Sequence, residues 1–276
     1  MAALLALLSS LLWGTADFGG GLVTRRLPAL AVVAWSQAAA LVLVTAVAVG
    51  SQAYRAPGGW LPWAVMAGVV GPLGLVLFYT ALATGTMGVV SPIAALGGIV
   101  PVVAGLVAGE RPSAVQWGGM VVALAGAVLA SGPELSGGTR ARAVLLAAAS
   151  GLCFGLCLWG IARGAASSSV MTLVGMRVTS CSVALVAALV LRTTGGVGRR
   201  DLLPLAAVGA ADGGANVLFG YAASLGEMVS VVSVLGTLYP VATVLLARWV
   251  LGERMLGVQR AGVGVALAGV VLLGAG

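Results

Sequence analysis

The chain has 276 residues, of which 61% are hydrophobic and 8% are charged, and its formal net charge is +7. A soluble domain carries about 25% charged residues, so this composition excludes an ordinary soluble protein and places most of the surface in lipid. All 14 basic residues are Arg, and most stand at the ends of apolar runs, which is typical of membrane topology rather than of nucleic-acid binding. We therefore expect the lipid bilayer, and no nucleic acid, as a partner.

Charged residues, Pro and Gly divide the chain into apolar segments of bilayer-spanning length, which takes about 20 residues. The predicted spans are 3–23, 29–50, 61–82, 88–108, 114–132, 143–163, 169–191, 202–223, 229–250 and 257–275. The first lacks the basic start of a signal peptide, so we expect it to be retained. Span 88–108 contains Pro92 and Pro101, and an interior Pro bends a helix, so this span is expected to bend most.

The sequence contains an internal duplication. The segment GERPSAVQWGGMVVALAGAVL at 109–129 reappears as GERMLGVQRAGVGVALAGVVL at 252–272, an offset of 143 residues. Weaker matches at offsets of 141 and 142 occur earlier in each half. We therefore divide the chain into two five-helix repeats, 1–135 and 136–276. Because five is odd, the second repeat enters the membrane with the opposite polarity.

The predicted fold class is therefore an all-α integral membrane protein with ten transmembrane helices in two inverted repeats. Inverted repeats characterise secondary transporters, whose substrate site lies near the membrane midplane between the halves. This arrangement predicts a transporter of a small-molecule substrate that works by alternating access, located in the cell membrane.

The repeated unit resembles the EamA-type family of the drug/metabolite transporter superfamily. The resemblance rests on WGTADF at 13–18, on the paired Gly-Glu-Arg followed by Gln and Gly, on YPVATVLLARWVLGE at 239–253 and on the in-span Arg177. It covers essentially the whole chain and implies a ten-helix exporter of a metabolite or drug, with a central cavity and no cofactor. The halves differ, since Ser36 stands where Arg177 would align.

Three ionisable side chains lie inside predicted spans, where each costs a few kcal/mol to insert. They are Asp17, Arg177 and Asp212. Each Asp lies on a helical stripe of small residues, and Asn216 shares the stripe of Asp212. Such a stripe either packs against a helix or lines a cavity. One interpretation is that Asp17 or Asp212 binds a proton or a cationic group of the substrate. The other is that an Asp pairs with Arg177 to fix two helices, or caps a helix break. The role of Arg177 also has two interpretations: it binds an anionic group of the substrate, or it is a structural partner.

Two aromatic residues, Trp13 and Tyr79, complete the candidate substrate or ion site, with anchoring at the membrane interface as the alternative. Glu110 and Glu253 each lie near a helix start, where a carboxylate stabilises the helix by ~0.3–1 kcal/mol. Small residues recur in both copies of the duplicated segment and predict close-packing seams between helices. They are Gly119, Ala123 and Gly126, and Gly262, Ala266 and Gly269.

No catalytic or metal-binding pattern stands out. The chain contains no His, and its three Cys form no CxxC pair. We expect neither enzyme activity, nor a catalytic residue, a metal or a cofactor. A protein that translocates a lipid or its headgroup and a non-transporting membrane scaffold are the alternative functions. Homo-oligomer formation, the substrate and proton coupling stay open. Counted by alternate loops without Arg177, ten Arg fall on one side and three on the other, which predicts that both termini lie outside the cytoplasm.

Overall fold

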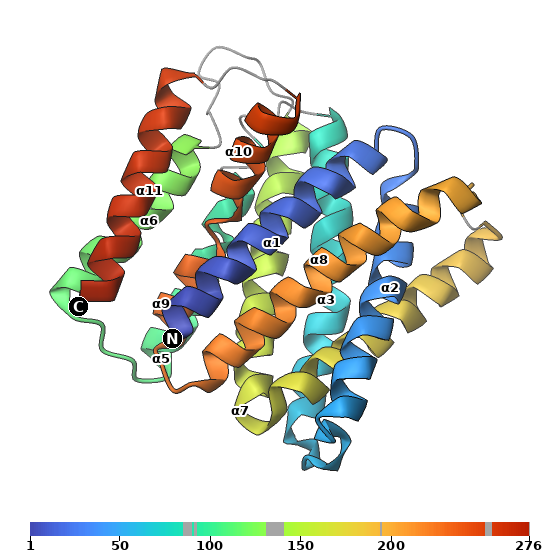
Figure 1. Ribbon diagram of the computed structural model, residues 1–276, viewed down its shortest axis with the longest axis horizontal. Coiled ribbons are helices and arrows are strands. Elements are labelled where there is room, and N and C mark those ends of the chain that lie inside the picture. The colour runs from blue at the N-terminus through green and yellow to red at the C-terminus, as the bar shows by residue number, and fades with distance from the viewer. Residues whose placement is uncertain (85–89, 91–92, 131–140, 194, 252–255, 276) are drawn as a thin grey trace.

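The computed structural model describes residues 1–84, 90, 93–130, 141–193, 195–251 and 256–275, whose regular structure is helical throughout (Figure 1). The helices are α1 (Ala2–Val23), α2 (Ala29–Gly50), α3 (Leu61–Thr84), α5 (Ile99–Val107), α6 (Ala114–Ala130), α7 (Ala141–Leu191), α8 (Arg199–Ser224), α9 (Val229–Gly236), α10 (Tyr239–Leu251) and α11 (Gly257–Ala275), with 3-10 turns η1 (Ala53–Arg55), η2 (Gly58–Trp60) and η3 (Leu96–Gly98). In the described residues, the bounds follow the predicted spans to within a few positions.

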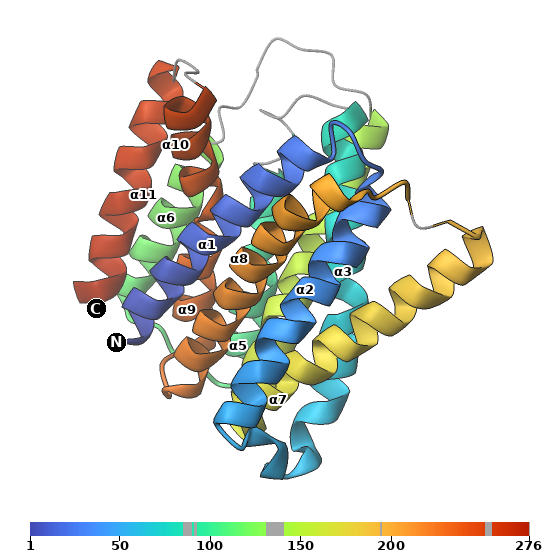
Figure 2. The same ribbon diagram turned by 45° about the vertical axis from the view of Figure 1, so that its right-hand side comes forward.

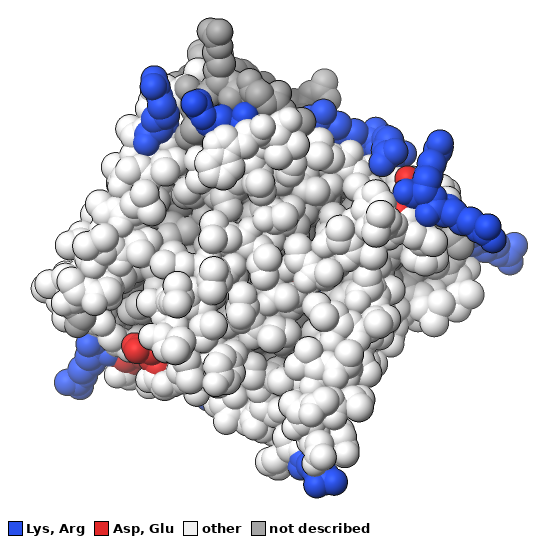
Figure 3. Space-filling model, in the orientation of Figure 1, with Lys and Arg blue, Asp and Glu red and all other residues white. Residues whose placement is uncertain are grey.

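The helices have the length and surface of membrane-spanning segments. Among the described residues, seven helical segments are long and apolar enough to cross a membrane, and two shorter apolar helices accompany them. Large apolar side chains such as Val42, Val121 and Leu189 stand exposed along them. Charged side chains gather at opposite edges of the molecule, and the face between them carries almost none (Figure 3). The chain is therefore a multi-pass membrane protein.

Several helices are interrupted. Within α7, Ser168 has φ −162° and ψ 111°, and the segments on either side of it run in different directions (Figure 2). The Ser168 Oγ accepts a hydrogen bond from the Met171 amide at 3.3 Å, as an N-cap residue does, which favours a new helix after the kink. The predicted span 88–108 tightens into η3 before α5, and the span 229–250 breaks between α9 and α10. Pro92, expected to contribute to the first bend, lies outside the described residues.

α6 and α11, which carry the duplicated segment, pack side by side at one edge of the molecule (Figures 1 and 2). A Cβ added to Gly126 would collide with the backbone of Ala266, and one added to Gly269 would collide with the backbone of Ala123. The expected close-packing seam is confirmed here. The two contacts are also reciprocal, because each joins a Gly of one copy to the same Ala position of the other.

A second reciprocal contact lies near the centre of the molecule. The backbone of Gly14 on α1 lies against the Tyr239 carbonyl at the start of α10, and that of Gly155 on α7 lies against the Gly97 carbonyl in η3. Gly14 precedes Gly155 by 141 residues, and Tyr239 follows Gly97 by 142 residues. The first helix of each half thus packs against the interrupted helix of the other half.

Candidate functional site

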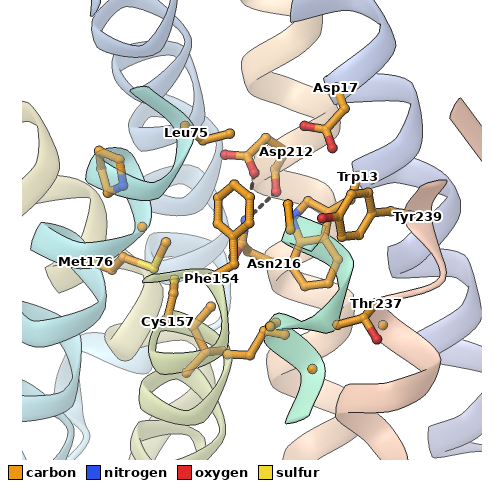
Figure 4. A pocket seen from close by; sticks show the side chains of 18 of the residues that line it. Trp13, Asp17, Leu75, Phe154, Cys157, Met176, Asp212, Asn216, Thr237 and Tyr239 are labelled. Carbon is orange, nitrogen blue, oxygen red and sulfur yellow. Dashed lines mark hydrogen bonds between the residues drawn. The ribbon is translucent and has the colours of Figure 1, made fainter. Parts of the chain in front are cut away.

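A cavity lies where these interrupted helices meet, and both halves of the chain line it. It offers about 80 Å³ to a water-sized molecule. The lining residues are Trp13, Asp17, Gln37, Gly71, Pro72, Leu75, Ala94, Gly97, Gly98, Phe154, Cys157, Leu158, Ile161, Met176, Arg177, Asp212, Asn216, Gly236, Thr237 and Tyr239. Figure 4 shows Asp17 near Asp212, with Trp13 and Tyr239 beside Asp17 and Phe154 across from them. Irregular backbone at this depth is typical of a cavity lining.

One side of the cavity contains a buried network around Arg177, whose residue is only 1% exposed. Its Nη2 lies 2.9 Å from Asp212 Oδ2, and its Nη1 donates a hydrogen bond to Gln37 Oε1. The Gln37 Nε2 in turn donates to Asp212 Oδ2 at 3.3 Å. A charge removed from water needs a charged and hydrogen-bonded partner, and this arrangement supplies both. It joins α7 to α8 and α2.

Asp212 receives further hydrogen bonds from its own helix. The Asn216 Nδ2 donates to Asp212 Oδ1 at 3.1 Å and to the Asp212 carbonyl at 2.6 Å. Both carboxylate oxygens of Asp212 are therefore occupied by protein groups. Of the two interpretations left open by the sequence, the helix-fixing pair is the one that this geometry supports for Asp212.

Asp17 is in a different situation. Within the part of the chain that the structure describes, its carboxylate has neither an ion-pair nor a hydrogen-bond partner. The side chain lies on the same face of α1 as Trp13 and borders the cavity. With both carboxylates ionised, the charges of Asp17, Asp212 and Arg177 sum to −1. The unpaired negative charge of the cavity is therefore that of Asp17.

The structure brings together five of the six candidate residues and leaves one apart. Trp13, Asp17, Arg177, Asp212 and Asn216 all line the cavity. The sixth candidate, Tyr79, is buried outside it, where its hydroxyl occupies the space that a side chain at position 20 would need. The described residues hold no group of three or more side chains suited to a metal ion.

Gln37, the residue that bridges Arg177 and Asp212, was not predicted from the sequence. An amide in the middle of an otherwise apolar span is a detectable signal, but the span 29–50 contains no ionisable residue that would indicate a polar site. Ser36, the neighbour of Gln37, also takes part in packing. Gly209 packs against the Ser36 carbonyl, and Gly68 packs against the Met176 carbonyl, so Gln37 and Arg177 each follow a residue on which a glycine of another helix rests.

Glu110 stabilises a helix start, as expected, but not the start of the helix that follows it. Its carboxylate accepts hydrogen bonds from the amides of Val229 at 2.6 Å and Ser230 at 3.1 Å. These amides begin α9, so the contact runs from the first half of the chain to the second. Glu253, the duplicate of Glu110, lies outside the described residues.

Comparison with known proteins identifies the family. The family model described as the EamA-like transporter family matches residues 1–132 and 141–275. The chain belongs to the EamA-like transporter family. The resemblance seen in the sequence is thus confirmed, and the family indicates a membrane transporter of the drug/metabolite transporter superfamily.

Structural comparison agrees on the fold. A solved structure described only as "Crystal structure of protein" superposes with a TM-score of 0.80 at 19% sequence identity, covering 98% of this chain and 95% of that chain. At this identity the likeness concerns the fold alone. No curated protein matches the chain.

Proposed function

We propose that this family member is a secondary transporter of the cell membrane that exports a small metabolite or drug by alternating access. The observation that carries the proposal is a central cavity between the two halves with one unpaired carboxylate, Asp17, on its wall. A charge in the membrane is costly and is retained where it serves a function. Residues from both halves surround it, which is the arrangement expected of a transport site.

The proposed architecture is ten spans in two inverted repeats, 1–135 and 136–276. The kink at Ser168 supports two spans within α7. The two ranges matched by the family model and the reciprocal contacts of α6 with α11 support the repeat. The inverted arrangement gives the protein two related interrupted helices, η3 with α5 and α9 with α10, one from each half, next to the cavity.

Asp17 is the proposed coupling group. In the exchange cycle, its carboxylate binds a proton on one side of the membrane and releases it when the substrate occupies the cavity. Asp212 and Arg177 hold the helices around it and keep their pairing throughout. Because a proton and a substrate compete for one carboxylate, substrate export is driven by proton entry.

The test is an export assay in cells that express the chain, its Asp17→Asn variant or its Asp212→Asn variant at matched membrane levels. Mass spectrometry of the medium and of the lipid fraction identifies compounds that accumulate outside only with the wild-type chain. We expect a small set of polar metabolites, lost with Asp17→Asn and on collapse of the proton gradient. Normal uphill export by Asp17→Asn would exclude Asp17 as the coupling group, and normal uphill export by both variants would exclude the proton-driven mechanism. Accumulation of lipids alone would favour lipid translocation.

A further inference from the structure

Two oxygen-bearing groups on the cavity wall are free to accept a hydrogen bond from a ligand. Asp17 is acceptor-only when ionised, and its carboxylate has no partner in the described residues. The Tyr239 hydroxyl is buried and likewise has no hydrogen-bond partner there. Figure 4 shows Trp13 and Tyr239 on the same side of the cavity as Asp17, and the ring of Trp13 offers a negative face. A carboxylate, a hydroxyl and an indole face together suit an ammonium group.

Arg177, the only cation among the described residues that line the cavity, is already neutralised. Arg177 is held by Asp212 and Gln37, as described above. Its Nε has no hydrogen-bond partner among the described residues, but Asp212 already balances its charge. A substrate anion placed near Arg177 would also meet the carboxylates of Asp212 and Asp17. The charge balance therefore disfavours an anion and favours a monocation.

The rest of the cavity is apolar. Phe154, Leu75 and Met176 face the polar wall, and Leu158 and Ile161 extend the apolar lining. Aromatic and thioether side chains of this kind favour an apolar, flat ligand body. The accessible space of about 80 Å³ disfavours a large multi-ring compound.

We infer that the site recognises an organic monocation, a protonated primary amine on a compact aromatic or apolar body. The ammonium group binds Asp17, Tyr239 and the face of Trp13, and the ring lies against Phe154. This inference rests on the proposed function, of which it names the substrate class.

The test is equilibrium binding to the purified full-length protein in lipid nanodiscs, measured by calorimetry. The ligands are phenethylamine, phenylalanine, 3-phenylpropionate and 3-phenylpropanol, which share one phenyl chain and differ in charge. We expect phenethylamine to bind at least ~10-fold more tightly than the other three, as one charged hydrogen bond implies. Asp17→Asn should weaken phenethylamine binding by ~10-fold or more, and Asp17→Glu should retain it.

Thr15→Val is the matched control, because Thr15 lies on α1 close to Asp17 but is exposed and does not line the cavity, so the affinity of this variant for phenethylamine should stay at the wild-type level. Thermal unfolding of each variant shows whether it is folded. Tighter binding of phenylalanine or 3-phenylpropionate, an unchanged affinity in folded Asp17→Asn, or no phenethylamine binding at ~1 mM would overturn the inference. Transport is scored separately in proteoliposomes. Binding without transport would therefore contradict the proposed function alone, and export of a zwitterion would contradict this inference alone.

Discussion

Asp17 and Asp212 are both aspartates inside predicted spans, but their neighbouring residues give them different roles. Asp212 lies 2.9 Å from a buried guanidinium and accepts amide hydrogen bonds from Gln37 and Asn216. Asp17, on the facing helix, has no such partners in the described residues and borders the cavity. The first therefore contributes to the positions of α2, α7 and α8, and the second is available to a ligand.

Removing one member of the buried pair should destabilise the protein more than removing both. Arg177→Gln leaves Asp212 as an uncompensated charge and should cost ~3–5 kcal/mol of unfolding free energy. Adding Asp212→Asn removes that charge, so the double variant should regain part of the loss. Unfolding of the purified protein in mixed detergent micelles measures both values. A double variant whose loss equals the sum of the two single losses would show that the pair is not coupled.

At the scale of elements, contacts between the halves are made at helix starts and at glycine seams. Glu110 lies just after α5 and holds the first two amides of α9. Gly262 on α11 lies so close to α6 that a Cβ would collide with the backbone at Ala130. Both contacts act across the boundary between the two halves.

Replacing Glu110 should loosen the start of α9. Glu110→Ala removes two charge-assisted hydrogen bonds and should cost ~1–3 kcal/mol, with faster amide exchange at Val229 and Ser230. Hydrogen exchange with mass spectrometry measures this locally. Glu227→Ala is the control, because Glu227 is exposed in the loop before α9. Equal exchange in the two variants would contradict the assignment.

Two glycines of α11, Gly262 and Gly264, should respond differently to replacement by Ala. Gly262→Ala forces α6 and α11 apart and should cost ~1–3 kcal/mol, as overpacking does. Gly264→Ala adds a Cβ into open space and, because Ala favours helix, should leave the melting temperature unchanged or slightly higher. Thermal unfolding in detergent compares them. A seam that tolerates Ala at both positions would mean that α6 and α11 separate at little cost.

At the scale of the whole molecule, the Arg side chains set the direction in which the bundle crosses the membrane. They gather mainly along one edge of the molecule, with few at the opposite edge (Figure 3). By the positive-inside rule, we expect the Arg-rich edge to face the cytoplasm. This orientation would place the turns between α2 and α3 outside and the connection between α7 and α8 inside.

This orientation predicts which introduced thiols react in intact cells. In a Cys-free background, Gly58→Cys should react with a membrane-impermeant maleimide without permeabilisation, because Gly58 is exposed in η2 on the outer side. Thr193→Cys, exposed after α7, should react only after permeabilisation. The reverse pattern would mean that the orientation is inverted, and equal labelling of both would indicate mixed insertion.

The periodic, apolar parts of the sequence allowed the helices to be predicted, since span lengths depend mainly on local composition. Against this apolar background, Asp17, Arg177 and Asp212 stood out as ionisable residues inside predicted spans. The choice of Asp212 over Asp17 as the partner of Arg177 was not predictable, because it depends on which helices are neighbours. The same holds for Glu110, whose amide partners are more than a hundred residues away. Gln37 was not predicted because, unlike Asn216, it shares its span with no ionisable residue.

The contact between Gly14 and Tyr239 has a consequence for the synthesis of the protein. α1 enters the membrane before α10 has been translated. At about 5–20 residues per second, the interval is on the order of 10–45 s. During that time the glycine surface of α1 lies against lipid, a neighbouring protein or the insertion machinery. The packing of α1 against α10 can therefore form only after most of the chain has been synthesised.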